Sequence, residues 1–120
     1  MKLIIQIPCF NEADTLQETL AQLPRAIRGF TSVEILIVDD GSSDDTSNVA
    51  WQNRADHVVR MERHSGLAQA YTFGLDAAYA DIFGAIEKVL VAGYRTADIM
   101  SPGKKQVGTV EMGDLVAERI

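Results

Sequence analysis

Two short apolar runs, each leading straight into a polar loop, constrain the fold of this chain more than any other feature. Residues 3–12 read LIIQIPCFNE, and residues 33–46 read VEILIVDDGSSDDT. Short, mainly apolar runs such as Leu3–Ile7 and Val33–Val38 are typical of strands buried on both faces of a parallel sheet. Because parallel strands share their carboxyl edge, we expect the two polar loops to lie side by side.

Helical patterns alternate with these strands. Asp14 or Thr15 can cap a helix that runs to about Leu23, where Pro24 ends it. A second helix is predicted to begin at one of two serines and to carry two acidic residues in its first turn, where they favour the helix dipole. These four residues are Ser42, Ser43, Asp44 and Asp45.

A third short strand over His57–Met61 precedes another helical pattern, from Gly66 to about Ala80. The predicted inner face of that helix consists of Leu67, Ala70, Tyr71, Gly74, Leu75 and Ala78. Strands that alternate with helices indicate an α/β fold with a Rossmann-like parallel sheet and right-handed crossovers.

The last third of the chain predicts two further helices. Residues 82–92 form a helical run that Gly93 can end, and residues 101–103 (Ser-Pro-Gly) form a turn. Thr109 is predicted to cap the final amphipathic helix. A three-stranded sheet with these additions leaves one strand edge unpaired, so the chain has a possible route to a homo-oligomer.

Composition excludes several classes of function. The net charge is −6 and no basic stripe is present, so we expect no general binding of nucleic acid. Cys9 is the only cysteine, which precludes an intrachain disulfide and favours a reducing compartment. No apolar stretch approaches 18 residues and no signal-peptide pattern is present, so we expect a cytoplasmic protein without a membrane span.

The polar loops carry the candidate binding residues. The ring of Phe10 can lie against a nucleobase, and the carboxylate of Asp39 or Asp40 can accept hydrogen bonds from the imide N–H of uracil or from guanine. Gly41 allows the chain to turn sharply beside a ligand. A helix beginning near Gly66 presents backbone N–H groups that suit phosphate.

Each of these signals also has an ordinary structural explanation. An acidic pair after a strand fits a helix start or a solvated turn, and Phe10 alone fits a core position. Cys9 fits a small buried side chain better than a nucleophile. Neither histidine has metal-ligand spacing, which suggests a surface position for His57 and a loop position for His64. A phosphoacceptor pocket would need a lysine on a further strand, whereas Lys88 falls in a predicted helix.

Three phrases together are more specific than any one of them. IPCFNE, VDDGSSDDT and HSGLAQAYTFGLDAAYA resemble the N-terminal half of family 2 glycosyltransferases with the GT-A fold, over about residues 1–80. The resemblance implies a half-domain that binds a UDP- or GDP-linked sugar. By that resemblance the nucleotide-sugar-binding residues are Pro8, Phe10, Glu12, Val38, Asp39, Asp40 and Gly66.

The chain departs from this family after residue 80. Family members continue into a strand that ends in Asp-x-Asp, whose carboxylates hold a divalent cation, Mg²⁺ or Mn²⁺, against the leaving diphosphate. Residues 81–120 contain only isolated acidic residues, including Asp81 at the start of a predicted helix. We therefore expect no catalytic residue, no retained metal site, and weak or no transfer by this chain alone.

A second resemblance covers residues 85–120. The phrases GYRTADIMSPG and VGTVEMGDLV are similar to the C-terminus of 3-isopropylmalate dehydrogenase, where the region supplies mainly structure. Arg95 and Asp98 are expected to form a local ion pair or cap. The predicted organisation is a nucleotide-binding half-domain over residues 1–80 and a helical tail over residues 81–120. A recombined gene, a misassembled reading frame or a deliberate chimera would each produce this join, and the alternative function is a non-catalytic association module or chimeric fragment.

Overall fold

The computed structural model describes all of residues 1–120 and has an α/β fold. Its elements, in chain order, are β1 (Lys2–Cys9), α1 (Leu16–Gln22), β2 (Ser32–Asp39), α2 (Thr46–Gln52), β3 (His57–Arg60), α3 (Leu67–Val91), β4 (Tyr94–Arg95), the 3₁₀ helix η1 (Ala97–Ile99), β5 (Lys105–Gln106) and α4 (Thr109–Ala117). The chain divides into two compact units, Lys2–Ala78 and Tyr79–Ile120 with Met1, and each is described by itself.

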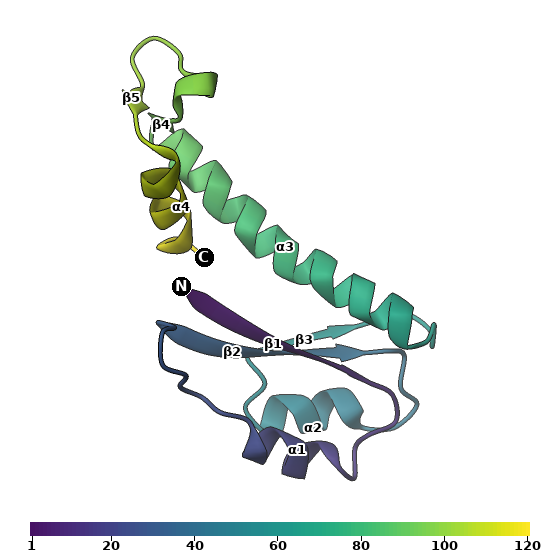
Figure 1. The fold of residues 1–120 in the computed structure, drawn as a ribbon. Helices are drawn as coiled ribbons and strands as arrows, with labels where there is room; N and C mark the ends of the chain where they lie inside the picture. The colour runs from purple at the N-terminus through teal and green to yellow at the C-terminus, as the bar shows by residue number, and fades with distance from the viewer. The chain divides into compact units, whose positions relative to one another are not determined.

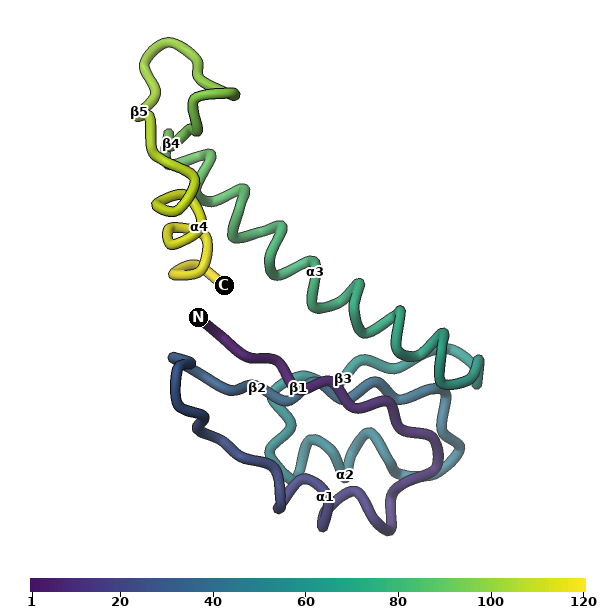
Figure 2. The backbone as a smooth tube through the Cα atoms, in the orientation of Figure 1, coloured from purple at the N-terminus to yellow at the C-terminus, as the bar shows by residue number.

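The first unit is built on a three-stranded parallel sheet in the order β1-β2-β3. Ile5 pairs with Ile35 and Ile37 with Val58, which places β2 in the middle and leaves β1 and β3 at the edges. The three predicted strands and the predicted parallel sheet are therefore confirmed. The chain enters each strand from the same end, so the three polar connections leave the sheet at one edge (Figure 2).

Helices α1 and α2 cover one face of this sheet, and the N-terminal half of α3 covers the other (Figure 1). On the first face, Leu16 and Leu20 of α1 and Ala50 of α2 are buried against Ile35 and Ile37. On the second face, Ala70 of α3 packs with two strand residues, Leu36 and Val38. Alternate side chains of β2 thus enter opposite cores, which explains why four consecutive residues in the middle of the strand, 35–38, are apolar.

A glycine sets the distance between α3 and the sheet. A Cβ atom added to Gly74 would lie 2.6 Å from the Cγ2 atom of Val38, which is closer than real Cβ contacts. The side-chain amide of Gln6 donates a hydrogen bond of 2.8 Å to the carbonyl of Tyr71 beside this contact. The absence of a side chain at Gly74 therefore lets the helix backbone rest almost directly on β1 and β2.

One long helix replaces the two that the sequence predicts over residues 66–80 and 82–92. Helix α3 runs without a break from Leu67 to Val91, and Asp81 lies in its interior rather than at a helix start. No proline interrupts the segment, and alanine is frequent between residues 77 and 85, so the local propensity favours continuation. The predicted boundary at residues 80–85 falls inside this helix.

The predicted inner face of α3 is partly wrong. Leu67, Tyr71 and Leu75 are 74%, 52% and 47% exposed, whereas Ala70 is buried and Ala78 packs against the same core. The close approach at Gly74 explains the difference, because it leaves room beneath the helix only for small side chains.

The start of α2 also differs from the prediction, although α1 begins and ends as expected. Helix α2 begins at Thr46, so Ser42 and Ser43 lie in the preceding loop and no acidic residue falls in its first turn. The carboxylate of Asp44 instead accepts hydrogen bonds from the backbone N–H and the hydroxyl of Thr46. This local bonding holds the loop outside the helix.

In the second unit, β4 and β5 form a short parallel pair, and α4 begins one residue after Gly108, its N-cap. Thr109 is therefore the first helical residue and not the predicted cap. Gly93 ends α3 with a φ of +96°, as expected, and Lys104 N–H closes the predicted turn on the carbonyl of Ser101. The guanidinium of Arg95 donates to the carbonyls of Leu90 and Tyr94. Of the two expected alternatives, Arg95 therefore caps the end of α3, and no ion pair with Asp98 is formed.

Candidate nucleotide site

A cavity of about 240 Å³ lies at the carboxyl edge of the sheet. Its walls come from the end of β1, the end of β2 and the connection into α3, which are far apart in the sequence. The lining residues are Pro8, Cys9, Phe10, Glu12, Asp40, His64, Leu67 and Ala70. The structure therefore brings four of the seven predicted binding residues, Pro8, Phe10, Glu12 and Asp40, to one cavity.

Asp39 is fully buried and its oxygens are held by the chain itself. Its Oδ1 accepts a hydrogen bond of 2.8 Å from the backbone N–H of Ser42, and its Oδ2 accepts one from the hydroxyl of Ser47. Arg60 lies 3.7 Å from the same carboxylate. Burial alone would raise the pKa of Asp39, but these hydrogen bonds and the positive charge of Arg60 outweigh it and lower that pKa.

Asp40 ties the loop before α3 to the end of β2. Its two carboxylate oxygens accept backbone N–H groups from Ser65 at 2.8 Å and Gly66 at 2.7 Å. The Nδ1 atom of His64 lies 2.8 Å from Asp40 Oδ2, the oxygen that Gly66 also contacts. Gly66 N–H is thus engaged by Asp40, and phosphate would meet the first turn of α3 from Leu67 onward.

His64 is the functional candidate that the sequence reasoning missed. Its imidazole stacks on the ring of Phe10, with ring centroids 3.8 Å apart and planes inclined by 23°. The sequence assigns it only to a loop, because the contact joins residues 54 positions apart. The signal available in the sequence is its position shortly before the predicted helix that begins near Gly66.

The loops after β1 and β2 are joined by hydrogen bonds that run in both directions. Asn11 N–H donates to Ser42 Oγ at 2.9 Å, and its side-chain carbonyl accepts the N–H of Ser43 at 2.8 Å. Glu12 N–H donates to Thr46 Oγ1 at 2.9 Å. These contacts orient Phe10 and Glu12 at the cavity, so much of the phrase DDGSSDDT positions the first loop.

The remaining predicted residues lie around the cavity rather than in its wall. Val38 is buried in the core between the sheet and α3, and Asp39 faces away into its own hydrogen-bond network. Gly66 adopts a φ of +91° in the connection that carries His64. Cys9 is buried in the wall, and burial, with Glu12 and Asp39 nearby, raises the pKa of its thiol to about 11.

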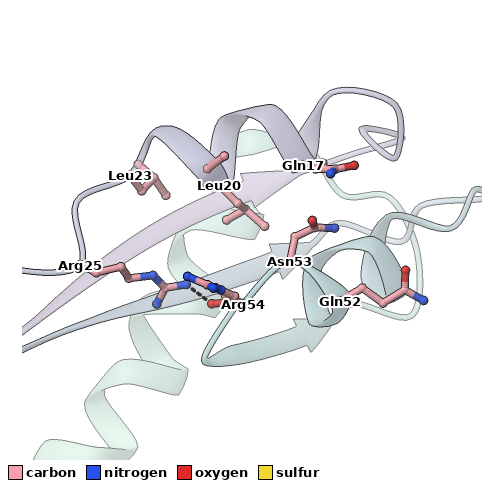
Figure 3. A pocket seen from close by; sticks show the side chains of 8 residues that line it. Gln17, Leu20, Leu23, Arg25, Gln52, Asn53 and Arg54 are labelled. Carbon is pink, nitrogen blue, oxygen red and sulfur yellow. Dashed lines mark hydrogen bonds between the residues drawn. The ribbon is translucent and has the colours of Figure 1, made fainter.

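A second cavity, of about 300 Å³, lies away from the strand ends, along α1 and the C-terminal end of α2 (Figure 3). None of the predicted binding residues lines it. Arg25 reaches across it to the carbonyl of Arg54 and pairs with Asp56 at 2.6 Å. These contacts satisfy carbonyl and carboxylate oxygens where two helices end, which is a structural role.

The residues present do not fit a divalent cation. No three His, Cys, Asp or Glu side chains come together as a metal-ligating group. At the strand ends, each carboxylate of the pair Asp39 and Asp40 is already engaged by N–H and O–H donors of the chain. Separately, no helix is both long and apolar enough to cross a lipid bilayer.

Comparisons with known proteins give two kinds of similarity. Residues 4–86 match the family Glycosyl transferase family 2. Among curated proteins, the 3-isopropylmalate dehydrogenase of Nitratidesulfovibrio vulgaris is 36% identical over 110 residues, which are 92% of this chain and 30% of that protein. The 3-isopropylmalate dehydrogenase of Clostridium pasteurianum is 48% identical over 56 residues, 47% of this chain and 16% of that protein. No solved structure gives a significant match.

The chain spans 30% or less of the length of these two dehydrogenases. The 110-residue match covers so much of the chain that it overlaps residues 4–86. Two family resemblances therefore meet in one chain, as the sequence predicts. Because the family match covers well over half of its residues, this chain belongs to glycosyl transferase family 2, and it also carries a segment similar to 3-isopropylmalate dehydrogenase.

Proposed function

We propose that residues 1–80 bind a nucleotide-diphosphate sugar, linked to UDP or GDP, and that this chain alone transfers the sugar weakly or not at all. The observation that carries the proposal is the cavity at the carboxyl edge of the sheet, which gathers Pro8, Phe10, Glu12 and Asp40 from separate segments. Ligands of open parallel sheets bind at this edge, where the connections diverge. Membership of glycosyl transferase family 2 supports a nucleotide sugar as the ligand.

The chemistry of the cavity suits a nucleoside. Phe10 is 40% exposed and offers a ring face for stacking with a base. The exposed carboxylate of Glu12 and the Oδ2 atom of Asp40 can accept N–H groups from the base edge or hydroxyl groups from the ribose. The diphosphate would then lie toward the first turn of α3, where backbone N–H groups lack intrahelical partners.

Transfer of the sugar would require a divalent-cation site that this chain does not provide. A leaving diphosphate carries negative charge, which a divalent cation usually offsets. No Asp-x-Asp occurs in residues 81–120, and the two aspartates at the strand ends have their oxygens engaged. The proposal is therefore recognition of the nucleotide without efficient turnover, with residues 81–120 in a structural role.

Isothermal titration calorimetry of the full chain with UDP, GDP and CDP tests this proposal. We expect UDP or GDP to bind more tightly than CDP, because cytosine has a lone pair where uracil and guanine carry a ring N–H. The variant Phe10→Leu should weaken binding about 10-fold through loss of stacking. Phe30→Leu is the matched control, since Phe30 is 37% exposed and does not line the cavity. Absence of binding of all three nucleotides at millimolar concentration would rule the proposal out.

A second candidate is a non-catalytic association module. The observation that favours it is the position of β1, an eight-residue strand at the edge of the sheet with one side unpaired. Exposed edges of this length are templates for pairing with another chain. Light scattering should then show a mass that rises with protein concentration, and a constant monomer mass would count against this candidate.

A further inference from the structure

The imidazole of His64 lies where the proposed function would place the nucleobase. We propose that His64 is an internal competitor of the base for Phe10 and Asp40, and that it thereby determines the affinity and the base preference of the site. This inference rests on the proposed nucleotide site. It assigns to one side chain a role that neither the family match nor the similarity to the dehydrogenases supplies.

The contacts of His64 are those of a small heterocyclic ligand. The ring stacks on Phe10 with centroids 3.8 Å apart, and its Nδ1 atom lies 2.8 Å from Oδ2 of Asp40. An ionised carboxylate only accepts hydrogen bonds, so Nδ1 carries the proton in this contact. Uracil and guanine can reproduce both contacts, because each has a planar ring with a ring N–H at its edge. Cytosine and adenine present a lone pair at the corresponding ring nitrogen.

The backbone that carries His64 is held in place, whereas about half of its side chain is exposed. A Cβ atom on Gly41 would lie 2.6 Å from the backbone nitrogen of His64, so the loop rests directly on the end of β2. Ser65 and Gly66 hold the same loop to Asp40 through their backbone N–H groups. The imidazole itself is 52% exposed. A base can therefore take its place after rotation of one side chain, without movement of the loop.

The test compares two histidine variants in the full chain by calorimetry with UDP and GDP. His64→Ala removes the competing ring but keeps the two backbone hydrogen bonds that shape the loop. We expect it to bind UDP or GDP about 10-fold more tightly than the unmodified chain, from the loss of one stacked ring that also contacts Asp40. His57→Ala is the matched control, because His57 is similarly exposed and pairs with Glu34 instead. It should leave the affinity unchanged.

The outcomes separate this inference from the proposed function. If the unmodified chain binds UDP or GDP and His64→Ala binds equally or more weakly, the competition is overturned and the nucleotide site stands. If neither protein binds any of these nucleotides, both the competition and the site are overturned. If His64→Ala binds more tightly than the unmodified chain and His57→Ala does not, the result supports both the competition and the nucleotide site.

Proton NMR gives a second readout that needs no histidine variant. The chain has only two histidines, so the ring signals of His64 can be assigned against those of His57. Stacking on Phe10 should shift the His64 signals upfield, and Phe10→Leu should remove that shift. Saturation with UDP or GDP should move them to the same unstacked position. His64 signals that stay unchanged at saturation would contradict the competition.

Discussion

Asp39 and Asp40 are adjacent in the sequence but have different roles in the structure. Asp39 is fully buried and holds Ser42 and Ser47, whereas Asp40 faces the cavity and holds the loop that carries His64. The alternation of side chains along a strand separates them, because successive residues point to opposite faces. Substitution of Asp39 should therefore affect mainly the stability of the fold. Asp40, which holds the loop with His64, should affect mainly the proposed binding of a nucleotide.

Asp39→Asn should destabilise the fold by about 2 kcal/mol at neutral pH, because an amide cannot accept all of the donors that the buried carboxylate satisfies. The pKa of Asp39 is lowered on folding from an ordinary value of 3.8, so the unfolded chain binds its proton first as the pH falls. This contribution to stability is complete above about pH 5 and is lost as the pH falls through the folded pKa. Urea unfolding of both proteins between pH 7 and the acid limit measures the difference.

Asp45→Asn is the matched control for this experiment. Asp45 is an exposed neighbour whose carboxylate accepts a hydrogen bond from Asn48 that an amide oxygen can also accept. Its stability should follow that of the unmodified chain at every pH. The difference in unfolding free energy between Asp39→Asn and the unmodified chain should shrink in acid. A difference that stays constant into the acid range would show that the charge of Asp39 does not contribute to stability.

At the scale of elements, the N-terminal half of α3 closes one face of the sheet. Gly74→Ala should cost about 1–3 kcal/mol of unfolding free energy, because the new Cβ atom would overlap Val38 and Gln6. Gly84→Ala lies in the same helix with open space around its position, so it should stabilise by about 0.5–1 kcal/mol through helix propensity. Thermal or urea unfolding of the two variants measures both effects. Equal changes in unfolding free energy for the two variants would refute the close packing at Gly74.

The three strands of the first unit and α1 could be predicted from the sequence, because their signals are local, whereas β4 and β5 were not predicted. An apolar run such as Val33–Val38 specifies a buried strand by itself, and Thr15 and Pro24 mark the ends of a helix. The continuity of α3 could not be predicted in this way, and its inner face was predicted only in part, at Ala70, Gly74 and Ala78. Leucine and tyrosine are the usual core residues of an amphipathic helix, and only the packed structure shows that the glycine and alanine side is the one that fits the sheet.

Some features of the candidate site could likewise be predicted from the sequence, and others could not. Pro8, Phe10, Glu12 and Asp40 could be placed from sequence, since each follows a strand and the carboxyl ends of parallel strands meet. The engagement of Asp39 by Ser42 and Ser47, and the stacking of His64 on Phe10, depend on side-chain directions in the folded loops. A pattern of residue types does not contain those directions.

At the scale of the whole molecule, the chain combines a glycosyl transferase family 2 segment with similarity to 3-isopropylmalate dehydrogenase. Residues 2–78 form a compact three-stranded α/β unit with a cavity at its carboxyl edge. Carboxylates that could complete a metal site are not gathered anywhere in the chain. On the proposed function, the chain recognises a nucleotide sugar and transfers the sugar weakly or not at all.

The most direct test of this account is calorimetric titration of the full chain with UDP-linked and GDP-linked sugars in the presence of a chelator, followed by analysis of the recovered nucleotide. The account predicts binding of at least one of them, equal affinity after Mg²⁺ or Mn²⁺ is restored, and mostly intact nucleotide sugar at the end. Absence of binding under both conditions, or extensive release of the nucleoside diphosphate once the cation is restored, would contradict it.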